Sequence, residues 1–393
     1  MERDFKRGRI LSVEKHLVLV GGGHAHLTSL KALSDFRNRG HRVTLISLSP
    51  YHYYSGMGPG LLSGIYQPWE VRFHVKRLAE NQGATFIKDK VVKIDPEREL
   101  LLLASGGAVQ YDVVSFNTGS EVPIESLNTA PGENVIPVKP IVNLLGVRRH
   151  LLKAMEENKV MNLVVIGGGP AGTEISANLW RLFQKSHGKG KITLLGGRRI
   201  MADAPDKVRS LALNSLLGRG LNVVEGAYAK AIEHGVVTLS DGRKVFFDMA
   251  LVAIGTRPPS LFRDSGLPTS ADGGLLVNAH LQSVRYANIF GGGDCVSLEG
   301  QPLARVGVYA VRESPILYHN LLSALEGANM MTFEAQKFFL LILNMGNGQG
   351  IFWKKNWVWQ SRLAFLLKDY IDRKFMRKFQ LSGELNEQYG SEE

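Results

Sequence analysis

Two glycine-rich turns carry the clearest chemical signal in this chain of 393 residues. Gly21 and Gly23 stand in the first turn, and Gly167, Gly169 and Gly172 complete a G-x-G-x-x-G pattern in the second. Each turn follows a short β-branched run and precedes a helical stretch. A turn in this position directs backbone N–H groups and the positive end of the helix at a phosphate, and its glycines allow the close approach. The two turns therefore predict two units that bind dinucleotides.

The residues of both turns are our candidate cofactor ligands. In the first turn, His26 stands where the pattern has its third glycine. A plain strand-to-helix turn is the alternative for either turn alone, but two copies in the same context disfavour it. No cysteine or acidic cluster accompanies His24 and His26, so we expect no metal site. The candidates are Gly21, Gly22, Gly23, His24, Ala25, His26, Gly167, Gly169, Pro170, Ala171 and Gly172.

The elements around the two turns repeat in the same order: strand, turn, helix, strand. A later strand closes each copy and ends in a small-residue turn, which adds Thr118, Gly119 and Gly255 as candidate ligands. The expected strands lie at 16–20, 42–47, 111–118, 162–166, 191–195 and 247–254, with helices running from the two turns to about 39 and 186.

The segment 287–295 is predicted as a strand that runs into a third glycine turn, and a helix is expected beyond it at 306–325. It adds Gly293, Asp294, Val306 and Gly307 to the candidate ligands. Beyond it we expect a strand at 338–344, a turn at 346–350 and a terminal helix at 357–379.

Together these elements predict an α/β protein with two Rossmann-like dinucleotide-binding domains and a small C-terminal extension. The composition, 44% hydrophobic and 21% charged, is that of a globular protein and excludes a disordered chain. The single cysteine, Cys295, excludes a disulfide framework. We place a discontinuous first domain at 1–122 and 257–330, a second at 123–256, and the extension at 331–393.

From about residue 15 to 380 the sequence resembles the pyridine nucleotide–disulfide oxidoreductase family, most specifically in the segment Ile289–Asp294. The resemblance implies the glutathione-reductase-like FAD/NAD(P) fold. It also implies FAD on the first domain, NAD(P)H on the second, and hydride transfer from NAD(P)H to FAD. In that family the aspartate matching Asp294 contacts the ribityl and pyrophosphate groups of FAD. A helix N-cap is the other interpretation of Asp294, and the two are compatible.

Within the family, the sequence looks most like type II NADH dehydrogenases and the flavoprotein module joined to some selenophosphate synthetases. Glu174 matches a family glutamate near the nicotinamide, where it could position the carboxamide. The alternative is an acid favoured by the helix N-terminus. Lys139 is expected to face the flavin, or to be a linker lysine in solvent. The helix start near Val306 would stabilise negative charge on the reduced flavin. The closer likeness is carried by 21–26, 54–64, 138–140, 307–312 and 368–376.

Two departures concern the nucleotides. Where an acid usually binds the adenosine ribose of FAD, this chain has Ser47, whose hydroxyl can still form a hydrogen bond. The equivalent strand of the second domain ends at Arg198 and Arg199 without an acid. That pattern favours a 2′-phosphate, so we expect NADPH to be accepted at least as well as NADH. A solvated surface turn is the alternative for the two arginines.

The missing cysteines exclude a sulfur relay. Ser55, Gly56 and Met57 stand where disulfide reductases of this fold carry their cysteine pair. Serine has no accessible thiolate-like state, and Cys295 is interpreted as a small buried filler rather than a redox thiol. Electrons are therefore expected to leave the reduced flavin directly for an acceptor.

The tail carries much of the net charge of +11. Between 352 and 380, eight Lys and Arg stand against two acids and are interleaved with aromatic residues. This favours an anionic membrane surface over nucleic acid. Docking on a membrane and packing on its own domain are both open for the terminal helix. Its expected apolar face is formed by Trp359, Leu363, Leu366, Leu367, Tyr370 and Ile371.

The leading hypothesis is an FAD-dependent NAD(P)H oxidoreductase that reduces a quinone-like acceptor. The alternatives are reduction of a selenium or sulfur compound, and a redox-sensing flavoprotein without turnover. The N-terminal stretch 2–9 is charged and no apolar run is long enough to span a membrane. We therefore expect a cytoplasmic protein, with peripheral attachment to the inner face of the membrane and a homodimer both open.

Overall fold

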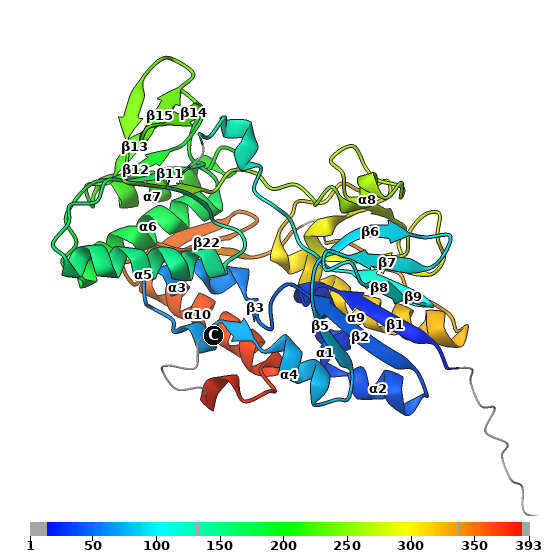
Figure 1. Ribbon diagram of the computed structural model, residues 1–393. Helices are drawn as coiled ribbons and strands as arrows, with labels where there is room; N and C mark the ends of the chain where they lie inside the picture. Colours follow the sequence, from blue (N-terminus) through cyan, green and yellow to red (C-terminus); the bar gives the residue numbers. More distant parts are fainter. Residues whose placement is uncertain (1–13, 131, 133, 337, 387–393) are drawn as a thin grey trace, which may run out of the picture. The chain divides into compact units, whose positions relative to one another are not determined.

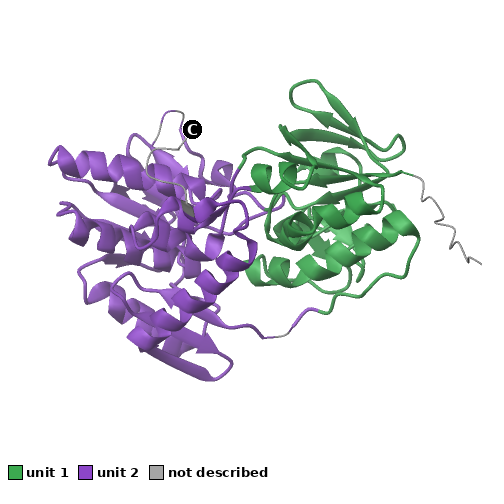
Figure 2. Ribbon diagram, turned by 90° about the horizontal axis from the view of Figure 1, so that it is seen from below, with its two compact units in different colours: residues 1–50, 75–119, 259–334 green, residues 51–74, 120–258, 335–393 purple. Residues whose placement is uncertain are grey.

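The computed structural model describes residues 14–130, 132, 134–336 and 338–386 (Figure 1), so the charged stretch at 2–9 lies outside the described residues. The chain forms two compact units, drawn in two colours in Figure 2. The first unit comprises 1–50, 75–119 and 259–334. The second comprises 51–74, 120–258 and 335–393, so the tail and the segment at 51–74 both group with the second dinucleotide-binding core.

The first unit is built on a parallel five-stranded sheet in the order β19-β9-β1-β2-β5. This is the Rossmann order, in which the chain reverses direction across the sheet between β1 and β9. β1 is buried along its whole length, as expected for a strand covered on both faces. The strands are β1 (His16–Val20), β2 (Arg42–Ser47), β5 (Thr85–Lys88), β9 (Val113–Phe116) and β19 (Ile289–Gly291).

Helices and two smaller sheets complete the first unit. The helix predicted after the first turn is interrupted at Ala32, whose ψ of 31° is not helical. The helix predicted at 306–325 is confirmed as α9 (Gly307–Glu326). The other elements are η1 (His24–His26), α1 (Leu27–Lys31), α2 (Leu33–Asn38), α4 (Val75–Glu80), α8 (Leu261–Asp264), η5 (Gly293–Cys295), the sheet of β6 (Val91–Asp95), β7 (Leu100–Leu103) and β8 (Ala108–Gln110), and the pair β18 (Leu275–Val277) and β20 (Val296–Leu298).

The second unit repeats the architecture with a parallel sheet in the order β10-β17-β11-β12-β13. The predicted α/β fold with two Rossmann-like cores is therefore confirmed. The strands are β10 (Val135–Pro137), β11 (Leu163–Ile166), β12 (Ile192–Leu195), β13 (Asn222–Val224) and β17 (Met249–Val252). The longer helices are α5 (Val142–Glu156), α6 (Pro170–Lys185) and α7 (Asp206–Leu217).

Shorter elements surround this core. The segment at 51–74 supplies α3, which packs against α5 and α6. These elements are β3 (His52–Tyr53), η2 (Ser55–Met57), α3 (Gly58–Leu62), η3 (Pro68–Glu70), β4 (Arg72–Phe73), η4 (Ile124–Leu127), and the sheet of β14 (Ala229–Glu233), β15 (Val236–Leu239) and β16 (Lys244–Phe246).

The tail folds as three antiparallel strands followed by one helix. These are β21 (Leu341–Asn344), β22 (Gly350–Lys354), β23 (Trp357–Ser361), α10 (Arg362–Phe379) and the short η6 (Glu384–Asn386). The helix predicted from 357 is therefore wrong over its first five residues, which form β23. Lys355 adopts φ +54° in the turn before β23, and Trp359 stacks on Phe352 of β22 with ring centroids 3.7 Å apart. The helix begins only where Ser361 accepts a hydrogen bond from the Ala364 N–H at 3.1 Å.

α10 packs on its own unit, and the residues that pack are not those of the predicted apolar face. Ala364, Met376 and Phe379 are buried, and α10 contacts β21 and β22. The predicted apolar face is instead the exposed one, with Leu363 exposed to 74% and Tyr370 to 62%. Leu366, Leu367 and Ile371 are exposed with them. The tail thus presents an apolar surface that no described residue covers.

Candidate functional site

In the first unit, three turns meet at the carboxyl ends of β1, β9 and β19, where Rossmann sheets bind their ligands. Gly21 has φ +89°, and a side chain there would collide with the carbonyl of Asn117. Gly23 lies directly against the Asn117 side chain. The two glycines are therefore required by close packing of the turns. At Gly119, in contrast, a Cβ would meet no atom within 4 Å, which leaves space beside the turn.

Asn117 joins the turns and was missed in the sequence analysis. Its side-chain oxygen accepts a hydrogen bond from the Ala25 N–H at 3.0 Å, and its amide nitrogen donates to the Gly292 carbonyl at 2.6 Å. One buried amide thus fixes the first turn to the third. A polar residue directly after the apolar run 113–116 is the sequence signal that could have identified it.

The His26 side chain is buried against the first turn and stabilises it. Its imidazole is fully buried, with Nδ1 2.6 Å from the Gly21 carbonyl and Nε2 2.8 Å from Ser115 Oγ. Burial lowers the pKa of His26 to about 4, so the ring is neutral. The ring therefore fills the place of the third glycine and fixes the turn, while His24 is also buried beside it.

The third turn carries Gly293 and Asp294 on η5. Asp294 is partly exposed, and Arg305 donates to its backbone carbonyl at 2.9 Å. Cys295 is fully buried, and burial raises the pKa of its thiol to about 11, as expected for an inert filler. Val306 is the N-cap of α9, and no side chain caps that end, although the Tyr309 N–H donates to the Val306 carbonyl at 3.1 Å. Ser47 ends β2 and is partly buried.

These observations fit an adenine dinucleotide in the first unit. Close-packed glycines, an uncapped helix end and a carboxylate in the third turn are the groups that a pyrophosphate and its attached hydroxyls require. FAD would be held by Gly21–His26, Thr118, Gly119 and the segments at 293–294 and 306–307. These assignments stay predictions.

The second unit repeats this geometry for the other nucleotide. Gly167 has φ +126° and lies against the Ala253 carbonyl, and Gly172 packs on the Gly167 carbonyl. Gly169 is the N-cap of α6, Pro170 and Ala171 open the helix, and no side chain caps it. A Cβ at Gly169 or at Gly255 would meet nothing within 4 Å. The helix end is thus open to a phosphate.

The two arginines of the basic turn after β12 differ in their surroundings. Arg199 donates to Asp206 at 3.2 Å and to the Ala202 carbonyl, whereas Arg198 is exposed. β12 itself ends without an acid, and Glu225, which follows β13, contacts the turn. It accepts from the Ile200 N–H at 2.7 Å and from Arg209 at 2.8 Å. The charge of the Glu225 carboxylate is therefore balanced by the Arg209 guanidinium in the same unit.

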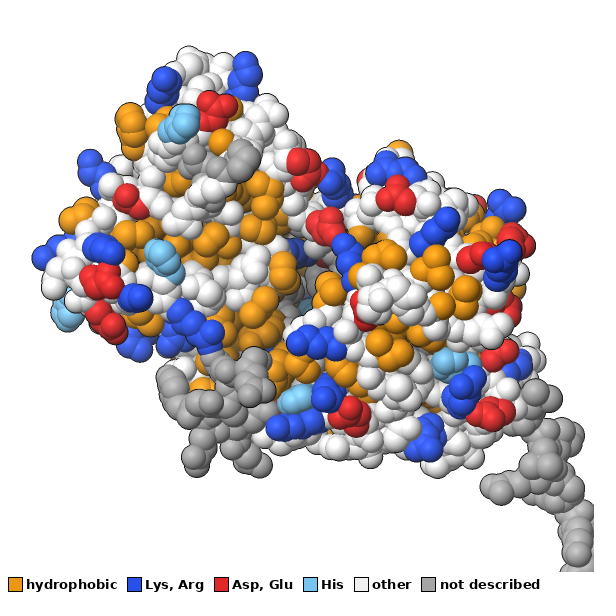
Figure 3. Space-filling model, in the orientation of Figure 1, with side chains coloured by type: hydrophobic (Ala, Val, Ile, Leu, Met, Phe, Trp, Pro, Cys, Tyr) orange, Lys and Arg blue, Asp and Glu red, His pale blue; other side chains and the backbone are white. Residues whose placement is uncertain are grey.

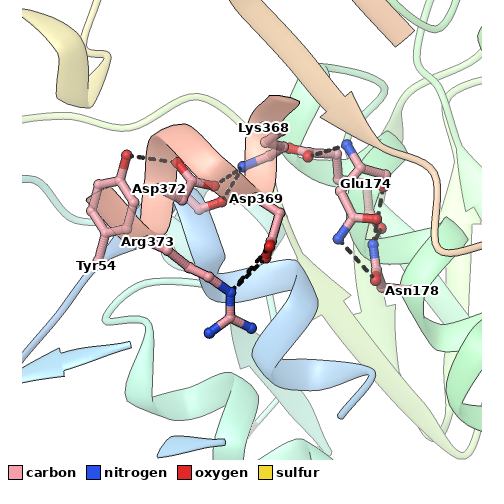
Figure 4. A network of polar contacts seen from close by, with 9 residues as sticks. Tyr54, Glu174, Asn178, Lys368, Asp369, Asp372 and Arg373 are labelled. Atoms are coloured by element: carbon pink, nitrogen blue, oxygen red, sulfur yellow. Dashed lines mark hydrogen bonds and ion pairs between the residues drawn. The ribbon is translucent and has the colours of Figure 1, made fainter. Parts of the chain in front are cut away.

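Glu174 lies at the centre of a buried polar network in the second unit (Figure 4). Its Oε1 accepts a hydrogen bond from the Asn344 N–H at 2.6 Å, and the Lys368 ammonium acts on its charge. Lys368 donates to Asp372 at 2.6 Å and to the Gly56 carbonyl at 2.7 Å. Tyr54 donates its hydroxyl to the other oxygen of Asp372 at 3.1 Å. Of the residues in this network, only Glu174 was predicted from the sequence as a catalytic residue.

The network carries several displaced pKa values. Burial raises the pKa of Glu174 to about 7, and Lys368 and the Asn344 N–H limit the rise. Burial alone would lower the pKa of Lys368, but the carboxylates of Asp372 and Glu174 outweigh it, so that pKa is raised. Burial likewise raises the pKa of Asp372. A carboxyl with a pKa near 7 beside an ammonium can hold or release a proton at neutral pH.

Further amides fix the network in place. Asn178 donates to the carbonyls of Glu174 and Asn344 at 2.8 and 3.1 Å, and Ser63 donates to its side-chain oxygen at 2.8 Å. Lys139, the second predicted catalytic residue, is half-buried and donates to Ser120 at 3.0 Å. The place of Lys139 beside the flavin stays a prediction, and the lysine whose charge acts on Glu174 is Lys368.

Two Rossmann cores, each with an open helix end after its first strand, define a protein of the class that binds two dinucleotides. The chain belongs to the pyridine nucleotide-disulphide oxidoreductase family, whose model matches residues 15–320. It is an FAD-dependent oxidoreductase that uses NAD(P)H.

Several known proteins are similar to this chain. Ferroptosis suppressor protein 1 of Taeniopygia guttata is 28% identical over 285 residues, or 68% of this chain and 71% of that protein. Demethylphylloquinone reductase NdbB of Synechocystis is 25% identical over 71% of each chain. The structure of NDH2 from Plasmodium falciparum in complex with NADH shares the fold, with a TM-score of 0.78 at 15% identity over 97% of this chain and 99% of that one.

Among the described residues, no helix is both long and apolar enough to cross a membrane.

Proposed function

We propose that this enzyme transfers two electrons from NAD(P)H through FAD to a quinone. The observation that carries the proposal is the buried proton-holding network around Glu174. Relatives support it, because one is named a demethylphylloquinone reductase and another a probable NADH dehydrogenase. FAD, when bound, accepts a hydride and passes the electrons on.

Proton balance explains why the network is needed. Reducing a quinone to a quinol consumes two electrons and two protons, whereas a hydride brings two electrons and one proton. One further proton must come from the solvent by way of the protein. Glu174, with a pKa of about 7, can supply it and be recharged. Lys368 keeps the resulting carboxylate paired, and Asp372 and the Gly56 carbonyl fix the lysine.

The replacement Glu174→Gln tests this role, because it keeps the shape and removes the titrating proton. We expect turnover with a short-chain quinone to fall about 100-fold, the usual contribution of one proton-transfer group. Bleaching of FAD by NAD(P)H should stay unchanged. Stopped-flow absorbance of the flavin separates the two steps. Lys368→Met should show the same pattern, whereas Glu156→Gln, at an exposed acid on α5, should not.

The opposite pattern would contradict the proposal. If Glu174→Gln slows bleaching and leaves reoxidation by quinone unchanged, Glu174 positions the nicotinamide instead. The segment Ser55–Met57 contains no cysteine thiol for an intermediate relay, and its Gly56 carbonyl already accepts a hydrogen bond from Lys368. Electrons therefore pass to the acceptor without a cysteine.

Attachment to a membrane surface is the partner interaction that the tail supports. Leu363, Leu366, Leu367, Tyr370 and Ile371 form the exposed apolar surface on α10, with Trp357 exposed beside them on β23. The exposed cations Arg362, Lys374, Arg377 and Lys378 belong to the same helix. Apolar area flanked by cations is the pattern of an interfacial helix on anionic lipid. On the face drawn in Figure 3, Lys and Arg are interspersed with Asp and Glu, without the continuous basic patch that nucleic acid requires.

Vesicle sedimentation tests the attachment. We expect the protein to pellet with vesicles of phosphatidylcholine and phosphatidylglycerol, less with phosphatidylcholine alone, and not after the double replacement Leu363→Asp and Leu366→Asp. Leu217→Asp, at a half-exposed leucine on α7, is the matched control. Equal pelleting of all variants would contradict the proposal. A homodimer through the same surface is the alternative, and light scattering would then show the double variant alone as a monomer.

A further inference from the structure

Glu313 is a buried acid that the reaction described above does not use. It lies on the second turn of α9 in the first unit and is only 3% exposed. Its Oε2 accepts a hydrogen bond from the Gly293 N–H at 2.5 Å. A Cβ at Gly292 would lie 3.1 Å from the same oxygen. The carboxyl therefore packs directly beneath the third glycine turn, between α9 and η5.

The charge of Glu313 conflicts with the ligand expected at this turn. The pyrophosphate of FAD carries two negative charges, and Asp294 adds another from η5. Burial, together with the smaller effect of Asp294, raises the pKa of Glu313 to about 7, although the Gly293 N–H acts to lower it. The negative charge of the pyrophosphate, brought to the same turn, also favours the neutral acid.

A small cavity gives the buried acid a route to exchange its proton. It has a volume of about 30 Å³ and is lined by Glu313, Asp294, Arg305 and Tyr309, among others. That is room for one water molecule with polar partners on several sides. Arg305 is held by Asp272 at 2.6 Å, so its charge is balanced there. The His26 ring on η1, which packs against α9, is neutral.

We propose that Glu313 is a positioning residue that couples FAD binding to the uptake of one proton. As a neutral acid it accepts the Gly293 N–H and shapes the turn for the pyrophosphate. As a carboxylate it keeps the turn but repels the ligand. The proton comes from solvent, and no electron moves. This inference concerns FAD binding alone and is independent of which acceptor takes the electrons.

Equilibrium dialysis of the purified holoprotein against free FAD between pH 6 and 9 tests the coupling, with flavin absorbance as the readout. We expect the Kd for FAD to rise above about pH 7, approaching tenfold per pH unit, as uptake of one proton requires. Glu313→Gln keeps the acceptor and removes the charge. It should show a flat profile and bind FAD at least tenfold more tightly than the natural protein at pH 9.

Glu326→Gln is the matched control, because Glu326 is on the same helix but pairs with Arg39 at the surface. It should retain the natural slope. A slope that persists in Glu313→Gln would assign the proton to another group, such as His24 in the first turn, and overturn the proposal. A flat profile in the natural protein would overturn it as well, even if Glu313→Gln did not fold.

Discussion

At the residue scale, two side chains of the same type can have different roles because their hydrogen-bond partners differ. Arg198 and Arg199 are neighbours in the sequence, but Arg199 is held by Asp206 and the Ala202 carbonyl, and Arg198 is exposed at the end of β12. Only a guanidinium that is not already engaged can bind an added phosphate without losing other hydrogen bonds. Sequence pattern alone could not distinguish the two, because the difference depends on how the turn folds back on α7.

This difference gives a prediction about nucleotide preference. Arg198→Ala should raise the KM for NADPH about tenfold, the equivalent of one charge-assisted hydrogen bond, and leave the KM for NADH nearly unchanged. Arg199→Ala should change both much less. Steady-state kinetics with each nucleotide gives the comparison. Equal changes in KM for the two variants, or an equal rise in the KM for NADH, would show that the turn does not bind a 2′-phosphate.

At the element scale, the sequence predicted the strands and helices that a local apolar pattern determines. It missed the strand that depends on pairing with another strand. The strands around the glycine turns and the helix α9 follow from apolar runs and turn residues, and they were confirmed. β23 was missed because Trp359 also fits a helical apolar face. Only its stacking on Phe352 and the pairing with β22 select a strand.

Which face of α10 packs on the protein was left open for a related physical reason. Lys368 and Asp372 read as polar surface, since a single sequence does not show their partners. They are buried because Glu174, Tyr54 and the Gly56 carbonyl, from distant parts of the chain, satisfy them. The candidate site was therefore predictable at its glycines and at Glu174, and not at Lys368, Asp372 or Asn117.

At the scale of the whole molecule, the described part of each unit has a buried glutamate whose pKa is raised to about 7: Glu313 in the first and Glu174 in the second. The ordinary pKa of such a carboxyl is 4.5. Because the folded value is higher, the folded state binds more protons between these two pH values. Each glutamate then stabilises the fold fully below about pH 4.5, and this contribution is lost as the pH rises to about 7. The loss is about 3 kcal/mol per group.

The five tryptophans allow the two contributions to be measured separately, because Trp69, Trp180, Trp353, Trp357 and Trp359 all lie in the second unit. In urea unfolding followed by tryptophan fluorescence, Glu174→Gln should remove about 2.5 kcal/mol of the difference in unfolding free energy between pH 5 and pH 8. Glu313→Gln should leave that tryptophan transition unchanged, because it alters only the first unit. If both replacements shift the transition equally, the two units unfold as one cooperative body, and the tryptophan signal reports the stability of the entire chain.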